Sequence, residues 1–307
     1  MKPTLLVLAA GMGSRYGGLK QLDGLGPHGE TIMDYSIYDA MRSGFGKVVF
    51  VIRKDFEEQF RDKVLSRYEG MIPAEVVFQE RDDLPEGYTA PADRVRPWGT
   101  NHAVMMGRSV IAEPFAVINS DDFYGRDAFR VLAAFLSEIP QGEKGRYSMV
   151  AFNVGNTTTK NGEVSRGVCA VNPNGKLKTV VERHHIVPVD EKTVSFTDEN
   201  GEKHHISSQT PVSMNFWGFT PDYFELSERE FRRFLDKFIA DPKREFFIPS
   251  VVDKLIGNGE ASVQVLPTES HWFGVTFSED REGVRKKLDY LHSRGLYPDN
   301  LFEAKKL

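Results

Sequence analysis

A glycine-rich segment close to the N-terminus holds the residues best suited to binding phosphate. It runs from Leu8 to Gln21 with the sequence Leu-Ala-Ala-Gly-Met-Gly-Ser-Arg-Tyr-Gly-Gly-Leu-Lys-Gln, directly after a short apolar run. Glycines let the backbone approach a phosphate closely and turn its N–H groups toward it. Arg15 and Lys20 add mobile positive charge, which suits a triphosphate. The segment therefore predicts a loop that binds a nucleoside triphosphate.

Two common phosphate-binding motifs do not fit this segment. A dinucleotide-binding loop has the pattern G-x-G-x-x-G and opens a helix, but Tyr16 stands in the third glycine position and Pro27 prevents an immediate helix. A P-loop has Gly-Lys followed by Ser or Thr, whereas here Leu19 precedes Lys20 and Gln21 follows it. Both motifs are excluded by their residues.

The segment resembles instead the signature of the nucleotidyltransferase superfamily, as found in sugar-1-phosphate nucleotidylyltransferases and their molybdenum-cofactor relatives. The shared pattern is Leu-Ala-Ala-Gly-x-Gly-x-Arg followed closely by Lys. The short spacing from Arg15 to Lys20 is that of the molybdenum-cofactor branch, so the loop alone leaves the acceptor open. The resemblance implies that Lys20 lies on the α-phosphate and Arg15 on the leaving pyrophosphate. The implied nucleotide contacts in the loop are Ala9, Ala10, Gly11, Gly13 and Ser14.

Two later segments resemble pieces of the N-acetylglucosamine-1-phosphate uridylyltransferases in the same superfamily. Gln79 ends an apolar run, and a Gly-Thr-x-His-Ala motif occupies 99–103. The resemblance implies that Gln79, Gly99 and Thr100 contact the base. A side-chain amide offers a donor and an acceptor to a base edge, and the missing Cβ of Gly99 would let the ring lie close. Thr100 is equally suited to be the N-cap of a helix over 101–108, and His102 is expected to pack.

A carboxylate after the next apolar run is the candidate metal ligand. The run 115–119 is followed by Ser120-Asp121, where the family usually has Gly-Asp. By this resemblance Asp121 binds Mg²⁺, the cofactor that we expect, and oxygen ligands suit this hard cation. The other role for an acidic residue here, the N-cap of a helix over 127–137, suits Asp122 or Asp127 better.

The second half of the uridylyltransferases supplies a Gly, a Glu and an Asn to the sugar. Matched by motif, these are Gly167, Glu182 and Asn215, which offer the short, fixed donors and acceptors that recognise hydroxyls. The family also often has a Trp-x-Asp-x-Gly segment whose Asp completes the metal site, and here Gly274 takes the place of that Asp. Either phosphates and water then complete the coordination of the metal, or another carboxylate does.

Two further features have no assigned chemistry. His184-His185 and His204-His205 are adjacent pairs, and adjacent residues on a strand face opposite sides, so neither pair can chelate a metal as a pair. The stretch 80–97 is rich in Asp, Pro and Gly and is expected to be irregular. It is interpreted either as a solvated insertion or as a lid over the nucleotide.

The apolar pattern predicts an α/β framework that positions these motifs. Strands are expected at 5–8, 48–52, 76–78 and 115–119, alternating with helices at 33–42, 56–68, 101–108 and 127–137. Such alternation indicates a Rossmann-like, mostly parallel sheet covered on both faces, with ligands beyond the carboxyl ends of the strands. Strands at 148–154, 167–171, 177–182, 193–196 and 212–219 indicate an antiparallel acceptor-binding region, and helices are expected at 221–239, 249–257 and 279–294.

Length and composition set the remaining limits. The 307 residues suffice for a nucleotidyltransferase core over 1–220, with a nucleotide half at about 1–125 and an acceptor half at about 148–220, and for C-terminal helices and strands over 221–307. A net charge of −5 argues against a nucleic-acid partner. One cysteine excludes an internal disulfide, and no apolar run approaches the ~20 residues that cross a bilayer. We therefore expect a cytoplasmic protein without a membrane partner.

These motifs together predict an enzyme that transfers a nucleoside monophosphate from an NTP to a phosphorylated acceptor and releases pyrophosphate. The residues assigned to the base favour UTP or dTTP, with CTP next. The acceptor is expected to be a sugar 1-phosphate or a small polar phosphate such as phosphocholine. Two alternatives remain open: a glycosyltransferase that consumes a nucleotide sugar and releases NDP, and a catalytically silent nucleotide sensor. The oligomeric state is unknown at this point.

Overall fold

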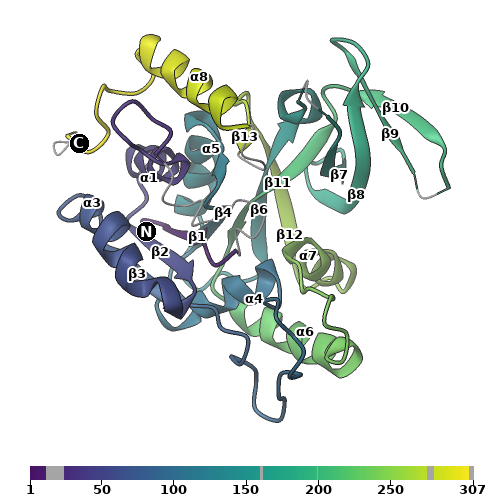
Figure 1. Ribbon diagram of the computed structural model, residues 1–307. Coiled ribbons are helices and arrows are strands. Elements are labelled where there is room, and N and C mark those ends of the chain that lie inside the picture. Colours follow the sequence, from purple (N-terminus) through teal and green to yellow (C-terminus); the bar gives the residue numbers. More distant parts are fainter. Residues whose placement is uncertain (12–23, 160–161, 199, 275–279, 304–307) are drawn as a thin grey trace.

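Four parallel strands form the first half of a central sheet in the computed structural model, which describes residues 1–11, 24–159, 162–198, 200–274 and 280–303. These strands are β1 (Thr4–Leu8), β2 (Lys47–Ile52), β3 (Ala74–Phe78) and β4 (Phe115–Asn119). They lie in the order β3-β2-β1-β4 (Figure 1). Parallel strands whose neighbours in sequence are helices have this arrangement in α/β proteins.

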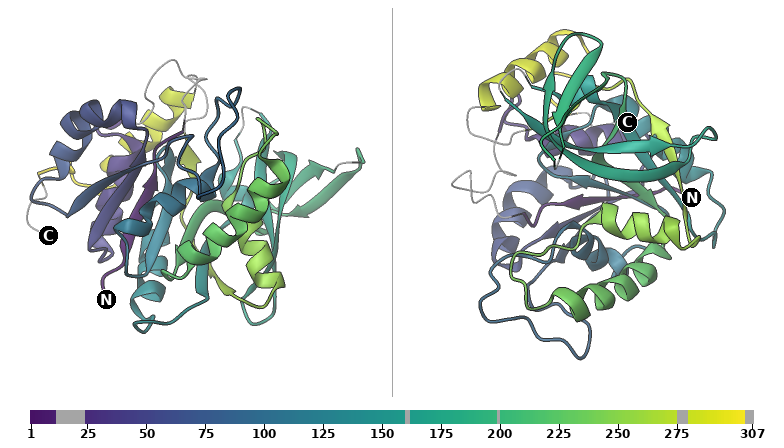
Figure 2. Two further views of the ribbon diagram at one scale, coloured as in Figure 1. Left: turned by 90° about the horizontal axis from the view of Figure 1, so that it is seen from below. Right: turned by 90° about the vertical axis from the view of Figure 1, so that its right-hand side faces the viewer.

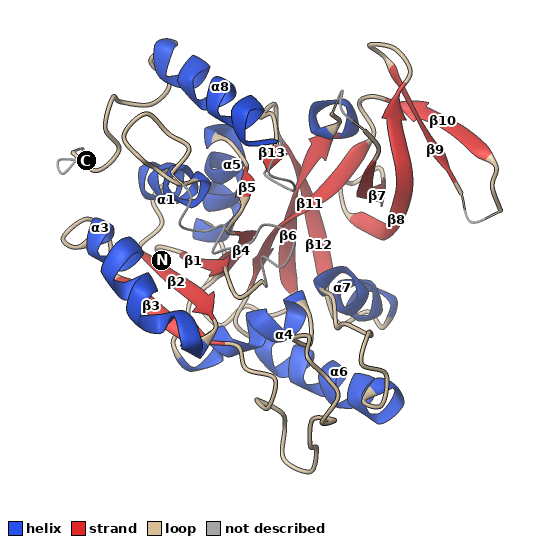
Figure 3. Ribbon diagram, in the orientation of Figure 1, coloured by secondary structure: helices blue, strands red, loops and turns tan. Residues whose placement is uncertain are grey.

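The second half of the sheet is largely antiparallel (Figure 3). β11 (Pro211–Phe219) joins it to β4, and the order continues through β7 (Val164–Val171), β8 (Leu177–Pro188), β9 (Thr193–Thr197) and β10 (Lys203–Ser207). β6 (Arg146–Asn153) pairs with β11 and with β12 (Ser262–Pro267). A separate short pair consists of β5 (Asp122–Phe123) and β13 (Phe273–Gly274). The β9–β10 hairpin projects away from the body of the molecule.

Helices cover both faces of the sheet, as Figure 2 shows. One face packs against α1 (Ile32–Arg42), α5 (Arg126–Ser137) and the helical segment formed by α2 (Glu57–Phe60), a π-helical turn (Arg61–Leu65) and α3 (Ser66–Tyr68). The other face packs against α4 (Thr100–Met105), α6 (Tyr223–Phe238) and α7 (Ile248–Gly257). α8 (Asp280–Ser293) lies over α1 through the buried side chains of Val284 and Leu288. Among the helices described, none is long and apolar enough to cross a membrane.

Alternation along the strands explains why both faces are buried. In β1, Leu5 and Val7 belong to the core on the α1 side, whereas Leu6 belongs to the core on the α4 side. Successive side chains on a strand point to opposite faces, so a strand covered on both faces is apolar throughout. All three side chains are fully buried. The continuous apolar runs of the sequence are thereby accounted for.

The expected fold class is confirmed, and nearly every predicted element is present within a few residues of its expected bounds. The strands β5, β10, β12 and β13 are not among the predicted strands. Of these, β10 lies at the end of the strand order. It pairs only with β9 among the described strands, and its side chains alternate between exposed and half-buried. A strand at the edge of a projecting hairpin buries little apolar surface, so it carries a weak signal in the sequence.

The stretch 80–97 is irregular, as expected, and is tied to α6 and to the backbone before α7. The hydroxyl of Tyr88 donates to Asp236 of α6 over 2.7 Å. Arg94 is fully buried and donates to the carbonyls of Asp241 and Arg244, at 3.2 and 2.8 Å, with its guanidinium 3.5 Å from the ring centre of Trp98. A buried cation satisfied by carbonyls fixes its segment in place. This segment is therefore docked on α6 at Tyr88 and Arg94, while about half of its residues are exposed.

The buried carboxylate of Asp39 in α1 leads to a prediction about pH. Asp39 accepts a hydrogen bond from the hydroxyl of Tyr297 over 2.6 Å, and burial raises the pKa of Asp39 from 3.8 to about 7. Because the pKa is higher in the folded state, Asp39 makes a favourable contribution to the free energy of unfolding at low pH. This contribution is complete below pH 3.8 and is lost as the pH rises through 7. Between these values, Asp39→Asn should gain stability relative to the wild type by at most about 1.4 kcal/mol per pH unit.

Urea denaturation of both proteins at several pH values between 4 and 8 measures this difference in the free energy of unfolding. A difference that does not change with pH would show that Asp39 is ionised in the folded state throughout this range.

Candidate active site

Several of the predicted site residues that the structure describes follow one another along the carboxyl edge of the parallel strands. Leu8 and Asn119 are register partners at the carboxyl ends of β1 and β4, and the amide of Ser120 donates to the carbonyl of Leu8 over 3.2 Å. The strand order β1-β4-β11-β7-β8 then sets the order of the site residues across this edge: first the end of the described loop at Gly11, then Asp121, Asn215, Gly167 and Glu182. Adjacent strands are about 4.8 Å apart.

Only the start of the glycine-rich segment belongs to the described residues. The amide of Ala9 donates to the carbonyl of Val51 over 2.8 Å, and Ala9 and Ala10 are buried in the cores on opposite faces of the sheet. Gly11 is exposed, and a Cβ added there would meet no atom within 4 Å. The other predicted residues of this loop, Gly13, Ser14, Arg15 and Lys20, lie outside the described residues.

Gln79 lies just beyond β3, with its side-chain amide held by two neighbours. Its Nε2 donates to the carbonyl of Gly99 and to Nδ1 of His102, each over 3.1 Å. Nε2 of His102 in turn donates to the carbonyl of Asp83 over 2.8 Å. Burial lowers the pKa of His102 to about 4, so the ring is neutral and its Nδ1 accepts. His102 therefore packs, as expected, and Oε1 of Gln79 is the amide atom left to accept a bond from a base.

Gly99 has a structural role that the sequence interpretation missed. Its φ is +105°, and a Cβ added there would lie 2.7 Å from both N and O of Phe246. The missing Cβ thus makes room for this backbone, while the contact of Gly99 with a base stays a prediction. The N-cap role of Thr100 is wrong: Gly99 occupies the N-cap position, and the hydroxyl of Thr100 accepts from the amide of Ile248 over 3.3 Å.

Two adjacent carboxylates follow β4. Asp121 lies in the turn after the strand, and Asp122 begins β5. The Asp122 carboxylate accepts from Nδ2 of Asn119 over 2.8 Å and from the hydroxyl of Tyr124 over 3.2 Å. Burial, together with the charge of Asp121, raises the pKa of Asp122 to about 7. Repulsion of this kind is relieved when a cation binds between the two carboxylates.

The same contacts correct the N-cap assignment of the acidic residues. Helix α5 starts after Gly125, and no side chain caps its first turn. Asp122 therefore has no capping role, and Asp127 lies inside the helix, where its carboxylate accepts from the hydroxyl of Thr268 over 2.7 Å.

Gly274 lies directly beside Asp122, because the two residues are partners in the β5–β13 pair. A Cβ added at Gly274 would lie 2.8 Å from Oδ1 of Asp122, 3.1 Å from Cζ2 of Trp272 and 3.2 Å from the carbonyl oxygen of Asp121. An oxygen of Asp122 thus occupies the space into which a side chain of residue 274 would extend. A carboxylate is present at this point in space although the sequence has glycine.

Asn215 is held in a conformation that few residues adopt. Its φ is +62°, at an irregularity in the pairing of β11 with β6 between Ser213 and Trp217. Asn tolerates this left-handed region better than most residues. Its Nδ2 donates to Oδ1 of Asn119 over 2.8 Å, and its Oδ1 accepts from Nε1 of Trp217 over 3.0 Å. Both groups of the amide therefore belong to a chain of hydrogen bonds that leads through Asn119 to Asp122.

The other two predicted acceptor residues face each other on β7 and β8. Gly167 and Glu182 are register partners, and a Cβ at Gly167 would lie 2.8 Å from Cγ1 of Val180 and 3.9 Å from Oε2 of Glu182. The backbone of Gly167 is thus closely packed, whereas Glu182 is exposed. Two residues next to predicted site residues were given no role in the site from the sequence. They are Asp122, which follows Asp121, and Arg166, which precedes Gly167.

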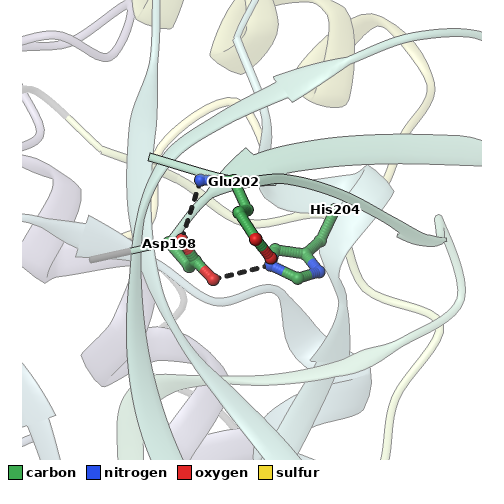
Figure 4. A group of neighbouring side chains, drawn as sticks. All are labelled: Asp198, Glu202 and His204. Atoms are coloured by element: carbon green, nitrogen blue, oxygen red, sulfur yellow. Dashed lines mark hydrogen bonds and ion pairs between the residues drawn. The ribbon is translucent and has the colours of Figure 1, made fainter. Parts of the chain in front are cut away.

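A second group of ligand-type side chains lies in the projecting hairpin, between Glu182 and Asn215 in the sequence. The ligand atoms of Asp198, Glu202 and His204 lie within 4.8 Å of one another (Figure 4). The carboxylate of Asp198 accepts from the amides of Asn200 and Glu202, each over 2.9 Å, and from Nε2 of His204 over 2.8 Å. These bonds close the β9–β10 turn. His204 belongs to this group and His205 does not; that neither adjacent histidine pair chelates a metal as a pair stays a prediction.

Comparison with known proteins identifies the fold. No protein-family model and no curated protein sequence matches this chain. Among solved structures, the chain is similar to the inositol-1-phosphate CTP transferase from T. maritima, with a TM-score of 0.59 and 13% sequence identity. The similarity covers 94% of this chain and 96% of the other. The chain therefore shares the fold of that structure over nearly its whole length.

Proposed function

We propose that this protein is a nucleotidyltransferase that transfers an NMP from an NTP to a sugar 1-phosphate or a similar phosphorylated acceptor. The observation that carries this proposal is the order of residues across the sheet edge: the start of the glycine loop, the carboxylates of Asp121 and Asp122, and then Asn215, Gly167 and Glu182. A fold shared with a CTP transferase at 13% identity adds support. Ligands of open α/β sheets bind at this edge.

Mg²⁺ is the proposed cofactor, and the described residues fit it. Asp121 and Asp122 offer oxygen ligands, and the oxygen of Asp122 lies in the space left by Gly274. We assign Asp121 as the principal ligand and Asp122 as the carboxylate that compensates for the glycine. Bound there, Mg²⁺ would neutralise charge on the phosphates.

The proposed chemistry needs no covalent intermediate. An oxygen of the acceptor phosphate attacks the α-phosphorus of the NTP, the bond from that phosphorus to the β-phosphate oxygen breaks, and pyrophosphate leaves. The attacking oxygen is already anionic, so no general base has to remove a proton. The chain contributes by positioning and by charge, with Lys20 on the α-phosphate and Arg15 on the pyrophosphate.

The base is proposed to be uracil or thymine, with cytosine next. Oε1 of Gln79 can accept from N3–H of uracil or thymine, or from the amino group of cytosine. Because the similar structure is that of a CTP transferase, CTP is an essential member of any test.

A matrix of four NTPs against a panel of sugar 1-phosphates and phosphocholine tests the proposal. The expected result is Mg²⁺-dependent release of pyrophosphate with one pair of substrates, with a product mass equal to the acceptor plus NMP. Release of NDP from a nucleotide sugar would favour the glycosyltransferase alternative instead. Tight nucleotide binding without turnover of any pair would favour the sensor.

A further inference from the structure

We propose that Arg166 binds the phosphate of the acceptor and so makes the site selective for phosphorylated acceptors. This inference rests on the proposed function, because it names the group that receives the acceptor. Arg166 lies on β7, on the acceptor side of Asp122 in the order of strands. Its side chain points to the face of the sheet that carries Val168 and Trp272, opposite to that of Gly167. The residues assigned to the NTP are at the end of β1, three strand spacings or roughly 14 Å away.

The guanidinium of Arg166 is fixed by the backbone and by an aromatic ring. Its Nε donates to the hydroxyl of Thr157 over 3.1 Å, one terminal nitrogen donates to the carbonyl of Thr157 over 2.5 Å, and the other donates to the carbonyl of Ser165 over 2.7 Å. Its carbon lies 4.6 Å from the ring centre of Trp272. The group is therefore held in one orientation before any ligand arrives, which lowers the entropic cost of binding.

These bonds leave part of the guanidinium available. Arginine has five N–H donors in a planar fork, and the three bonds use Nε–H and one N–H on each terminal nitrogen. One N–H therefore remains on each terminal nitrogen. Two such donors side by side match two oxygens of a phosphate, in the bidentate geometry that arginine favours.

The charge of Arg166 is poorly compensated by the protein. No ion pair within 4 Å among the residues described involves Arg166, although the carboxylates of Asp122 and Glu182 interact with it at longer range. Partial burial lowers the pKa of Arg166 to about 10, which leaves it charged at neutral pH. A cation that has lost water and lacks a close counter-ion gains when an anion binds.

The path from Arg166 to the proposed metal ligands is short. The guanidinium carbon of Arg166 lies 4.6 Å from the ring centre of Trp272. A Cβ added at Gly274 would lie 3.1 Å from Cζ2 of this ring and 2.8 Å from Oδ1 of Asp122. A phosphate held by Arg166 would thus lie near the carboxylates that hold the metal. Its oxygen would be presented toward the α-phosphorus, as the proposed attack requires.

The test compares Arg166→Gln and Arg166→Lys with the wild type for the substrate pair found in the matrix. Loss of a bidentate charged contact should raise the acceptor KM by about 30- to 100-fold for Arg166→Gln and by less for Arg166→Lys, which keeps the charge but not the fork. The NTP KM should change by less than about twofold. Arg146→Gln is the matched control, because Arg146 also stacks on an aromatic ring, Phe135, but at the opposite edge of the sheet.

A binding measurement separates this inference from the proposed function. Inorganic phosphate is titrated into each protein and followed by calorimetry, with thermal melts to verify folding. Phosphate binding that weakens at least tenfold in Arg166→Gln, but not in Arg146→Gln, supports the role of Arg166 even when no transfer is found. Equal phosphate affinity in Arg166→Gln and the wild type, equal rises in both KM values, or no phosphate binding by the wild type would overturn it.

Discussion

The substitution Asp121→Asn should slow pyrophosphate release by about 10²- to 10³-fold at saturating substrates. The amide keeps the size of the side chain but removes the negative charge that we assign to the metal. Because a lost ligand also weakens metal binding, the rate should be measured over a wide range of Mg²⁺ concentration. Direct binding of Mn²⁺ to the wild type and to Asp121→Asn, followed by electron paramagnetic resonance, gives a second readout independent of turnover.

Asp82→Asn is a suitable control for this change. The side chain of Asp82 is 69% exposed and pairs with Arg81 in the docked segment 80–97, so its loss should leave turnover and Mn²⁺ affinity unchanged. Asp122→Asn addresses the second carboxylate and should shift the Mg²⁺ dependence to higher concentration. Wild-type turnover and Mn²⁺ affinity in Asp121→Asn would remove Asp121 from the metal site and, with it, the proposed mechanism.

The framework of the fold could be predicted because its signal is local. The strands around Leu6, Val49 and Val117 are apolar on both faces, and each helix that follows repeats apolar residues with its own period. Such patterns reflect only which residues are buried, so they can be recognised without knowing which segments pack together. The position of Asp121 follows in the same way, because a residue just after a buried parallel strand must lie at the carboxyl edge of the sheet.

The contacts within the site could not be predicted in this way, because they join residues distant in the sequence. The hydrogen-bond chain from Trp217 through Asn215 and Asn119 to Asp122 depends on the register of β11 against β4. The sequence motif assigned Asn215 to the acceptor, whereas both groups of its amide are used to position other side chains. One N–H and one acceptor position of the amide remain for a ligand.

The relation between Asp122 and Gly274 has the same origin. In the sequence, Gly274 stands where the family often has an Asp that binds the metal. In space, the β5–β13 pairing sets the Asp122 carboxylate against that glycine, and a bulkier residue at 274 would displace the carboxylate. Register partners 152 residues apart give no signal in a single sequence that could have led to this pair.

Gly99→Ala should destabilise the protein by about 3 kcal/mol, the largest effect on folding that we expect from a single methyl group. A side chain at φ +105° is strained, at a cost of roughly 1–2 kcal/mol. The added Cβ would also lie 2.7 Å from the backbone N and O of Phe246, which cannot move without disturbing the hydrogen bond from the Phe246 amide to the carbonyl of Trp98. Overpacking of this kind adds about 1–3 kcal/mol. Urea denaturation of the two proteins measures the difference.

Gly87→Ala separates strain from collision, because Gly87 has a similar φ of +95° but no atom within 4 Å of an added Cβ. It should therefore cost only the strain, about 1 kcal/mol. The two substitutions add the same methyl group at similar backbone angles, so the excess cost in Gly99→Ala reports the contact with Phe246 alone. Equal losses in both variants would mean that the backbone at Phe246 yields to the added methyl group. The predicted contact of Gly99 with a base is a separate question, which nucleotide binding to Gly99→Ala measures.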